Sequence, residues 1–238
     1  MVKLLKRSIR KFIYDGRSNI DNKINLNYFL KKNDLTFYIK TFGPKNPNKR
    51  FYLIQRLIGG GMFSNLNYVI HHIKIAKDLN CIPIIDMKNF PTKYNEKYKI
   101  HNSLNSWDYY FYPINRYKLH EVYKSKFVII TDGETKKNAE FDSFESLSNT
   151  HYQIYKKYIK IKKEIIEEAQ LFVNKNFSKD KVLGVHFRGT DMKTQERHPF
   201  PPVPNQIISI INYQIKKYKF KKIFLVTEDL KNLSIRKK

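Results

Sequence analysis

A dense group of polar side chains directly follows a short apolar run at residues 182–185, in the sequence HFRGTD. An apolar run of this length predicts a buried strand. His186, Arg188 and Asp191 would then lie at the carboxyl end of that strand, where open α/β sheets bind their ligands. The guanidinium of Arg188 offers a planar fork of donors that fits a phosphate. Gly189 provides a position where the backbone can bend or approach a ligand closely. The sequence therefore predicts an anion site at Arg188.

A glycine-rich loop is a second candidate anion site. It comprises residues 59–61 and follows the first strong strand pattern, residues 51–57. From Ser64 to Leu79 the apolar residues recur with helical spacing, which predicts a helix with Ser64 as its N-cap and Asn80 as its stop. Backbone N–H groups at a helix start carry partial positive charge. The loop contains neither GxGxxG nor GK[ST], so it is either an anion cradle or a tight turn without a ligand.

The remaining patterns place these two candidate sites in an α/β fold. Strands are predicted at 82–86, 127–131 and 222–227, and helices at 159–173 and 206–218, with a polar irregular stretch before residue 150. A strand, loop, helix and strand in succession are typical of a parallel sheet.

An aromatic segment, NSWDYYFYPI at residues 105–114, has two interpretations. Trp107, Tyr109, Tyr110 and Phe111 either pack in the core or between domains, or form a platform for a sugar ring. Packing is the favoured interpretation, because large aromatic side chains bury the most apolar area.

The composition is that of a globular protein. Of 238 residues 41% are hydrophobic, and 46 basic against 21 acidic residues give a formal charge of +25. Such a charge attracts polyanions. The lysines are spread evenly and do not interleave with aromatic residues as on a nucleic-acid surface, so compositional bias is favoured over a selected polyanion surface and no specific nucleic acid is expected.

Cys81 is the only cysteine, which excludes an intrachain disulfide and predicts a buried, inert thiol. The sequence has no apolar run long enough to cross a membrane, and its basic start lacks the apolar region of a signal peptide. We therefore expect a cytoplasmic protein that contacts a membrane at most peripherally, through its charge.

Four features, taken in order, resemble the superfamily that groups α1,2-, α1,6- and protein O-fucosyltransferases with the nodulation fucosyltransferase. HFRGTD matches the signature HxRxxD. The other three are the glycine loop GGGMFSNLNYVI (59–70), NSWDYYF (105–111) and a strand ending in FLVTED (224–229). Together they cover about residues 51–230.

The resemblance implies a GT-B-like architecture of two Rossmann-like domains and a GDP-fucose donor, with fucose passed to a hydroxyl of a glycan or glycolipid. In such an enzyme Arg188 binds the β-phosphate of GDP and stabilises it as it leaves. One branch places its catalytic base five residues after the motif aspartate, which is Glu196 here; the alternative is a solvated loop residue.

The resemblance also implies a set of donor-binding residues. Besides Arg188 these are His186, Gly189, Asp191, Lys193, Gly60, Gly61, Ser64, Asn65 and Asp229. Asp229 either contacts the nucleoside or caps a helix. No DxD, HExxH or paired CxxC occurs, so no metal or other cofactor is expected.

Three segments are predicted: a basic leader or small N-terminal addition (1–50), an acceptor-side Rossmann-like domain (51–178) and a donor domain (181–238). The last has room for two strands and one helix, so it is expected to be incomplete. Three alternatives to a fucosyltransferase stay open: an inactive truncated relative, a transferase for another nucleotide sugar, and a non-enzymatic polyanion-binding protein.

Overall fold

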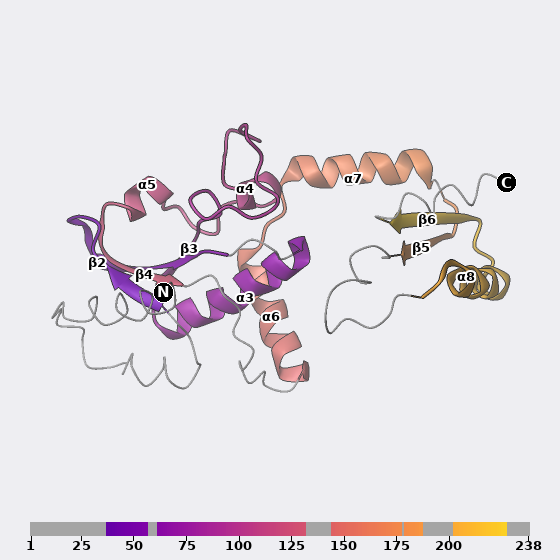
Figure 1. Cartoon of the computed structure of the whole chain (residues 1–238), viewed down its shortest axis with the longest axis horizontal. Helices are drawn as coiled ribbons and strands as arrows, with labels where there is room; N and C mark the ends of the chain where they lie inside the picture. Colours follow the sequence, from indigo (N-terminus) through magenta and orange to yellow (C-terminus); the bar gives the residue numbers. More distant parts are fainter. Residues whose placement is uncertain (1–36, 57–60, 132–143, 178, 188–201, 228–238) are drawn as a thin grey trace, which may run out of the picture. The chain divides into compact units, whose positions relative to one another are not determined.

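The structure is a computed structural model that describes residues 37–56, 61–131, 144–177, 179–187 and 202–227. The chain divides into two compact units, Met1–Lys162 and Lys163–Lys238. Each unit is described by itself (Figure 1). The domain limits predicted from the sequence stay a prediction.

The first unit is built on a mixed four-stranded sheet (Figure 1). Its strands are β1 (Phe37–Lys40), β2 (Lys45–Ile54), β3 (Ile82–Ile85) and β4 (Ser125–Thr131), in the order β1-β4-β2-β3. β2 runs parallel to β3 and β4, whereas β1 runs antiparallel to β4. The predicted α/β class is confirmed, and β1 is an edge strand that the sequence patterns did not reveal.

Helix α3 (Met62–Asp78) connects β2 to β3 and packs against one face of the sheet. Its buried side chains recur every three or four positions and include Val69, Ile73 and Ala76. This spacing places them on one side of the helix, as the sequence predicted. They join the core cluster that also contains Tyr52 and Ile54 of β2.

The structure differs from the prediction at the N-terminal end of α3 and agrees with it at the C-terminal end. The N-cap is Gly61, and Ser64 lies inside the first turn, so the predicted N-cap was wrong. The physical reason is that the helical hydrogen bonds already begin at Gly61, whose carbonyl accepts from Asn65 N–H at 2.9 Å. Asn80 has a φ of 51°, a left-handed conformation that ends a helix, as expected.

Alternating side chains of β2 divide the core of the first unit into two clusters. Tyr52 and Ile54 face α3, while Phe51 and Leu53 pack on the opposite face with Val122. Val122 belongs to the short helix α5 (Leu119–Val122). Figure 1 shows α3 and α5 on opposite sides of the sheet. All four β2 side chains are fully buried, so this strand is the centre of the unit.

The connection from β3 to the short helix α4 (Trp107–Tyr110) is held by side-chain amides. Asn95 donates to the carbonyls of Met87 and Leu104, at 2.5 and 3.0 Å. Asn105 donates to the carbonyl of Ile85 and accepts from Met87 N–H, at 3.1 and 3.0 Å. These bonds satisfy backbone groups at the end of β3 and in the connection that follows it.

From residue 144 the structure has two helices, where the sequence predicted an irregular stretch to about residue 150 and then a single helix. They are α6 (Phe144–Tyr158) and α7 (Lys163–Asn176). The predicted helix start at Ile159 was therefore wrong, although the pattern of α7 was correctly identified as helical. Ile154 and Ile159 are buried in the same cluster as the α3 face.

The break between α6 and α7 has a tertiary cause. Lys160 accepts a backbone hydrogen bond from Tyr112 N–H at 2.8 Å, and Lys162 N–H donates to the carbonyl of Tyr110 at 2.9 Å. Residues 160–162 therefore run as an extended segment beside 110–112, which interrupts the helical pattern. A local sequence pattern cannot show this pairing.

The second unit contains α7 and a parallel β–α–β arrangement. Strands β5 (Val182–Phe187) and β6 (Lys222–Thr227) pair in parallel and are connected through α8 (Pro204–Tyr218). These elements confirm the predicted strands and helix to within two residues. Phe224 of β6 contacts the rings of Phe172 and Phe177, with centroids 5.6 and 5.3 Å away.

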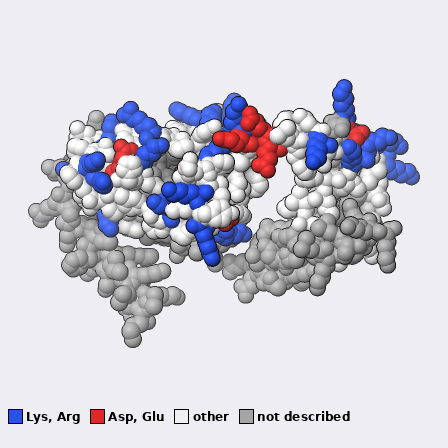
Figure 2. Space-filling model, turned by 90° about the horizontal axis from the view of Figure 1, so that it is seen from above, with Lys and Arg blue, Asp and Glu red and all other residues white. Residues whose placement is uncertain are grey.

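Basic side chains lie in separate groups on one face of the described surface (Figure 2). On the face shown in Figure 2, groups of Lys and Arg are separated by neutral residues. This distribution fits the compositional explanation of the charge of +25. None of the helices in the described ranges has the length and apolar character needed to cross a bilayer.

Candidate functional site

The described part of the predicted site in the first unit lies where β2 ends and α3 begins. Ser64 and Asn65 both fall in the first turn of α3, with Gly61 as N-cap. Ser64 is exposed and Asn65 is buried. Gly60 lies outside the described residues. The structure thus brings Gly61, Ser64 and Asn65 together at the carboxyl edge of the parallel strands, where α/β sheets bind ligands.

Arg56 is the residue that sequence reasoning missed at this edge. Its Nε donates to Asn65 Oδ1 at 3.2 Å, and its Nη2 donates to Ser64 Oγ at 3.4 Å. The guanidinium also lies 4.5 Å above the ring of Tyr68. These contacts join the end of β2 to the start of α3. The signal was present as an arginine three residues before the glycine loop, but the predicted strand at 51–57 included this arginine.

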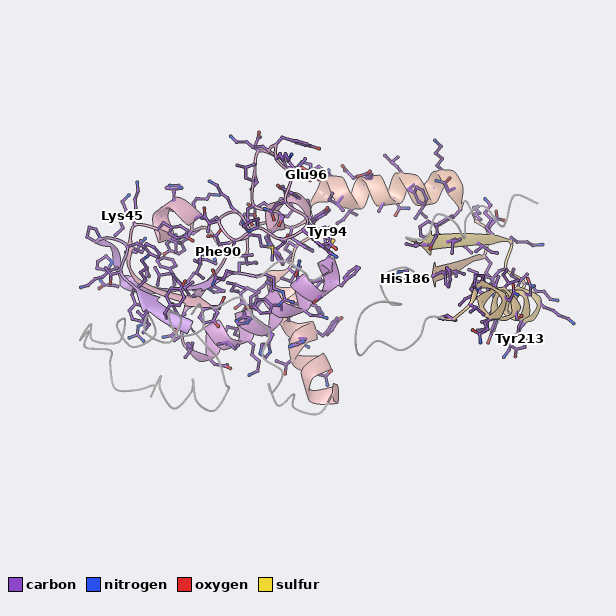
Figure 3. All side chains as sticks on the ribbon, in the orientation of Figure 1. Lys45, Phe90, Tyr94, Glu96, His186 and Tyr213 are labelled. Atoms are coloured by element: carbon purple, nitrogen blue, oxygen red, sulfur yellow. The ribbon has the colours of Figure 1, made fainter. Side chains whose placement is uncertain are left out.

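The helix start also engages a tyrosine from the β3–α4 connection. Met62 N–H donates to the hydroxyl of Tyr94 at 2.8 Å. Figure 3 labels Tyr94 beside this end of α3. Gly61 has φ −64° and ψ 164°, a conformation open to any residue. A Cβ at Gly61 would meet only the Tyr94 hydroxyl, at 3.9 Å. The backbone of Gly61 therefore does not by itself require glycine.

A glutamine and a threonine tie the ends of β2 and β4 together. Gln55 N–H donates to Thr131 Oγ1 at 3.1 Å, and Gln55 Nε2 donates to the Thr131 carbonyl. Both residues are buried. Because β2 and β4 are parallel, these bonds fix the relative position of their carboxyl ends. They hold in place the edge from which Arg56 projects.

In the second unit only the start of the predicted anion site is described. β5 ends at Phe187, and His186 is exposed near that end, in register with Val226 of β6 (Figure 3). Arg188, Gly189, Asp191, Lys193, Glu196 and Asp229 lie outside the described residues. Their predicted roles stay predictions.

The favoured interpretation of the aromatic segment, that its side chains pack in the core, is confirmed for three of its residues. Trp107, Tyr109 and Phe111 are buried, and the rings of Trp107 and Phe111 stack with centroids 4.4 Å apart. Phe111 and Trp107 belong to the same core cluster as Ile129 of β4. Stacking and burial of this kind leave no ring face of Trp107 open to a sugar.

The thiol of Cys81 is buried, as predicted, and burial raises its pKa to about 12. At pH 8 the native thiol should therefore be almost entirely protonated. We expect a disulfide reagent to label the native protein at least roughly a thousandfold more slowly than the urea-unfolded protein, because only the thiolate reacts. Absorbance of the released thiol measures this. Equal rates in the two states would contradict a buried, inert Cys81.

Histidines of the first unit occupy two different environments. The Nδ1 atom of His72 lies 2.9 Å from the hydroxyl of Tyr52, and burial lowers its pKa to about 3. The neighbouring His71 turns its ring by 89° from that of His72. The two rings therefore face different partners, because adjacent positions on a helix point in different directions. Among the described residues, no group of three or more His, Cys, Asp or Glu is placed to hold a metal ion.

Structures of a fucosyltransferase are among the known structures that resemble the chain. This agrees with the resemblance that the sequence motifs indicated. No family model matches the chain, and no curated protein matches it in sequence.

These structures are of NodZ, an α-1,6-fucosyltransferase. The structure soaked with GDP-fucose has a TM-score of 0.47 and 15% identity, covering 79% of this chain and 74% of that chain. The enzyme from Bradyrhizobium has a TM-score of 0.44 and 15% identity, covering 79% and 76%. The form co-crystallised with GDP has a TM-score of 0.44 and 14% identity, covering 79% and 75%. The similarity concerns the fold.

Proposed function

We propose that this protein is a GT-B-like glycosyltransferase that moves fucose from GDP-fucose to a hydroxyl of a glycan acceptor, with inversion and without a metal ion. The observation that supports this most directly is the position of the HxRxxD sequence. β5 pairs in parallel with β6 and ends at Phe187, directly before Arg188. An arginine at the carboxyl end of a parallel strand is well placed to bind a phosphate.

The proposed chemistry assigns a charge role to Arg188. Transfer of a sugar passes through an oxocarbenium-like state and leaves negative charge on the departing diphosphate. The arginine would stabilise that charge, which a metal ion does in other transferases. Glu196 would accept the proton of the acceptor hydroxyl. His186 and Asp191 would shape the pocket and orient Arg188.

The remaining donor-binding residues keep their predicted roles in this proposal. Lys193, Gly189 and Asp229 belong to the second unit, whereas Gly60, Gly61, Ser64 and Asn65 belong to the first. Arg56 joins the proposal as a positioning residue, because its hydrogen bonds to Ser64 and Asn65 fix the start of α3.

The test is calorimetric titration of GDP, UDP and ADP into the full chain at physiological salt. We expect GDP to bind and Arg188→Ala to weaken it at least roughly tenfold, because a hydrogen bond to a charged group contributes about 1.5 to 3 kcal/mol. The matched control is Arg116→Ala, since Arg116 is an exposed arginine of the first unit. It should bind GDP as the wild type does.

Each other outcome has a defined meaning. Preferential binding of UDP or ADP would indicate a transferase for another nucleotide sugar. Equal loss in both arginine variants, with steep weakening at higher salt, would indicate a polyanion-binding protein. If no nucleotide binds a folded sample, the chain has no working donor site and the enzyme proposal fails. A positive result leads to an acceptor screen with GDP-fucose.

A further inference from the structure

A histidine pair lies between two helices of the first unit, away from the proposed donor site. His71 is on α3 and His151 is on α6. Their ring centroids are 6.1 Å apart, with an angle of 74° between the ring planes. The third histidine of this region, His72, is engaged by the hydroxyl of Tyr52 and does not belong to the pair.

Each member of the pair has a buried ring nitrogen that lacks a hydrogen-bond partner. These atoms are Nδ1 of His71 and Nε2 of His151, and the statement holds for the part of the chain that the structure describes. A buried polar atom without a partner is costly and rare in native proteins. Two such atoms on neighbouring imidazoles, with ring centroids 6.1 Å apart, suggest a shared occupant that satisfies both.

The surroundings keep both imidazoles in the form that binds a metal. Burial is the main cause that lowers the pKa of His71 and of His151, and the charge of Lys74 lowers both further. Lys74 is itself paired with Asp78, at 3.0 Å. The two rings are therefore neutral near pH 7, with lone pairs available, as metal coordination requires.

We propose that His71 and His151 form a two-histidine site for a divalent transition-metal ion, with water completing the coordination. Imidazole nitrogens suit Zn²⁺, Cu²⁺ and Ni²⁺. With nitrogen–metal bonds of about 2.1 Å, a tetrahedral angle places two imidazole centroids roughly 5 Å apart, so the two rings would move closer by about 1 Å from the observed separation on binding. An ion held by both residues would fasten α6 to α3.

The site differs from a closed structural zinc site. Within the described ranges no third His, Cys, Asp or Glu joins the pair as a ligand group. With two protein ligands the remaining positions belong to water, so binding should be reversible and weaker than in a four-ligand site. No sequence pattern predicts this pair, because the two histidines come from helices far apart in the chain.

The test uses the full chain, freed of metal by a chelator and then titrated with ZnCl₂ in a calorimeter at pH 7.5. We expect one Zn²⁺ to bind and each of His71→Asn and His151→Asn to weaken it. Loss of a hydrogen-bond partner of a metal ligand alone costs about 10- to 100-fold in affinity, so loss of a ligand should cost at least about tenfold. The control is His120→Asn, because His120 is exposed on α5.

A second measurement needs no variant and guards against a failure to fold. Cu²⁺ bound to the wild type should give an electron paramagnetic resonance spectrum with splitting from two imidazole nitrogens. Unchanged Zn²⁺ affinity in His151→Asn, or no binding to the wild type, would overturn the proposal. A buried water bridging the two nitrogens would then be the occupant.

Discussion

Replacing Phe51 with alanine should lower the free energy of unfolding of the first unit by about 4 kcal/mol. Phe51 is fully buried at the centre of β2 and packs edge to face on Tyr117, with ring centroids 5.0 Å apart. Its removal loses the transfer free energy of the ring and leaves a cavity that the surrounding strands can fill only in part. The loss of stability should therefore affect the packing of β2, the central strand of the first unit.

Urea unfolding followed by tryptophan fluorescence measures this loss of stability in the first unit. Trp107 is the only tryptophan of the chain and is buried in the first unit, so its signal reports on that unit. The matched control is Phe63→Ala, because Phe63 is 78% exposed in the first turn of α3. We expect it to change stability by less than about 0.5 kcal/mol. Similar losses in the two variants would contradict the central place of β2 in the core.

Replacing Asp86 with alanine should lower the free energy of unfolding of the first unit by about 3 kcal/mol. Asp86 is fully buried directly after β3. Its carboxylate accepts from the backbone N–H groups of Lys88 and Asn89 at 3.1 and 2.9 Å, and from the Asn89 side chain at 2.9 Å. The hydroxyl of Tyr123 donates to it at 2.5 Å. Without the carboxylate, these donors would lose their partner in the interior.

Tyr123 allows a test of how much of the stability provided by Asp86 comes from one of its hydrogen bonds. Burial, and then the hydrogen bond to Asp86, raises the pKa of Tyr123 well above its usual value, so the hydroxyl stays a donor. Tyr123→Phe should cost about 1.5 to 3 kcal/mol, and the double variant should cost less than the sum of the two. The control Asp78→Ala removes an exposed ion pair with Lys74 and should cost less than about 1 kcal/mol. Additive losses for Asp86 and Tyr123 would show that they do not act together.

The elements that sequence patterns predicted well are those whose form is decided locally. β6 matches its predicted residues, and α8 differs only at its start, where Pro204 occupies the first turn. For both elements, the periodicity of the apolar residues and the flanking residues suffice to predict the type and the limits of the element. β1 was missed because it is a short edge strand whose partner β4 lies far along the chain. The α6–α7 break was missed for the same kind of reason, since its backbone pairs with 110–112.

The candidate site divides in a similar way. The motif residues around Arg188 could be proposed as a site from types and spacing, because they stand in one short segment of the sequence, and their roles stay predictions. Arg56 could not, since its role depends on the hydrogen bonds that join β2 to α3. The proximity of His71 and His151 depends on how α6 packs on α3, which no spacing within either helix predicts.

The strand order β1-β4-β2-β3 also has a consequence for synthesis of the chain. β4 lies between two strands that precede it in sequence, so β1 and β2 lack their shared neighbour until residue 131 has been made. While the chain grows from its N-terminus, β2, α3 and β3 can form a parallel unit early, because they are contiguous. β4 must then insert between β1 and β2 to complete the sheet. Until it does, the edge of β2 that pairs with β4 stays open on the ribosome, and an unpaired strand edge makes a nascent chain prone to aggregation.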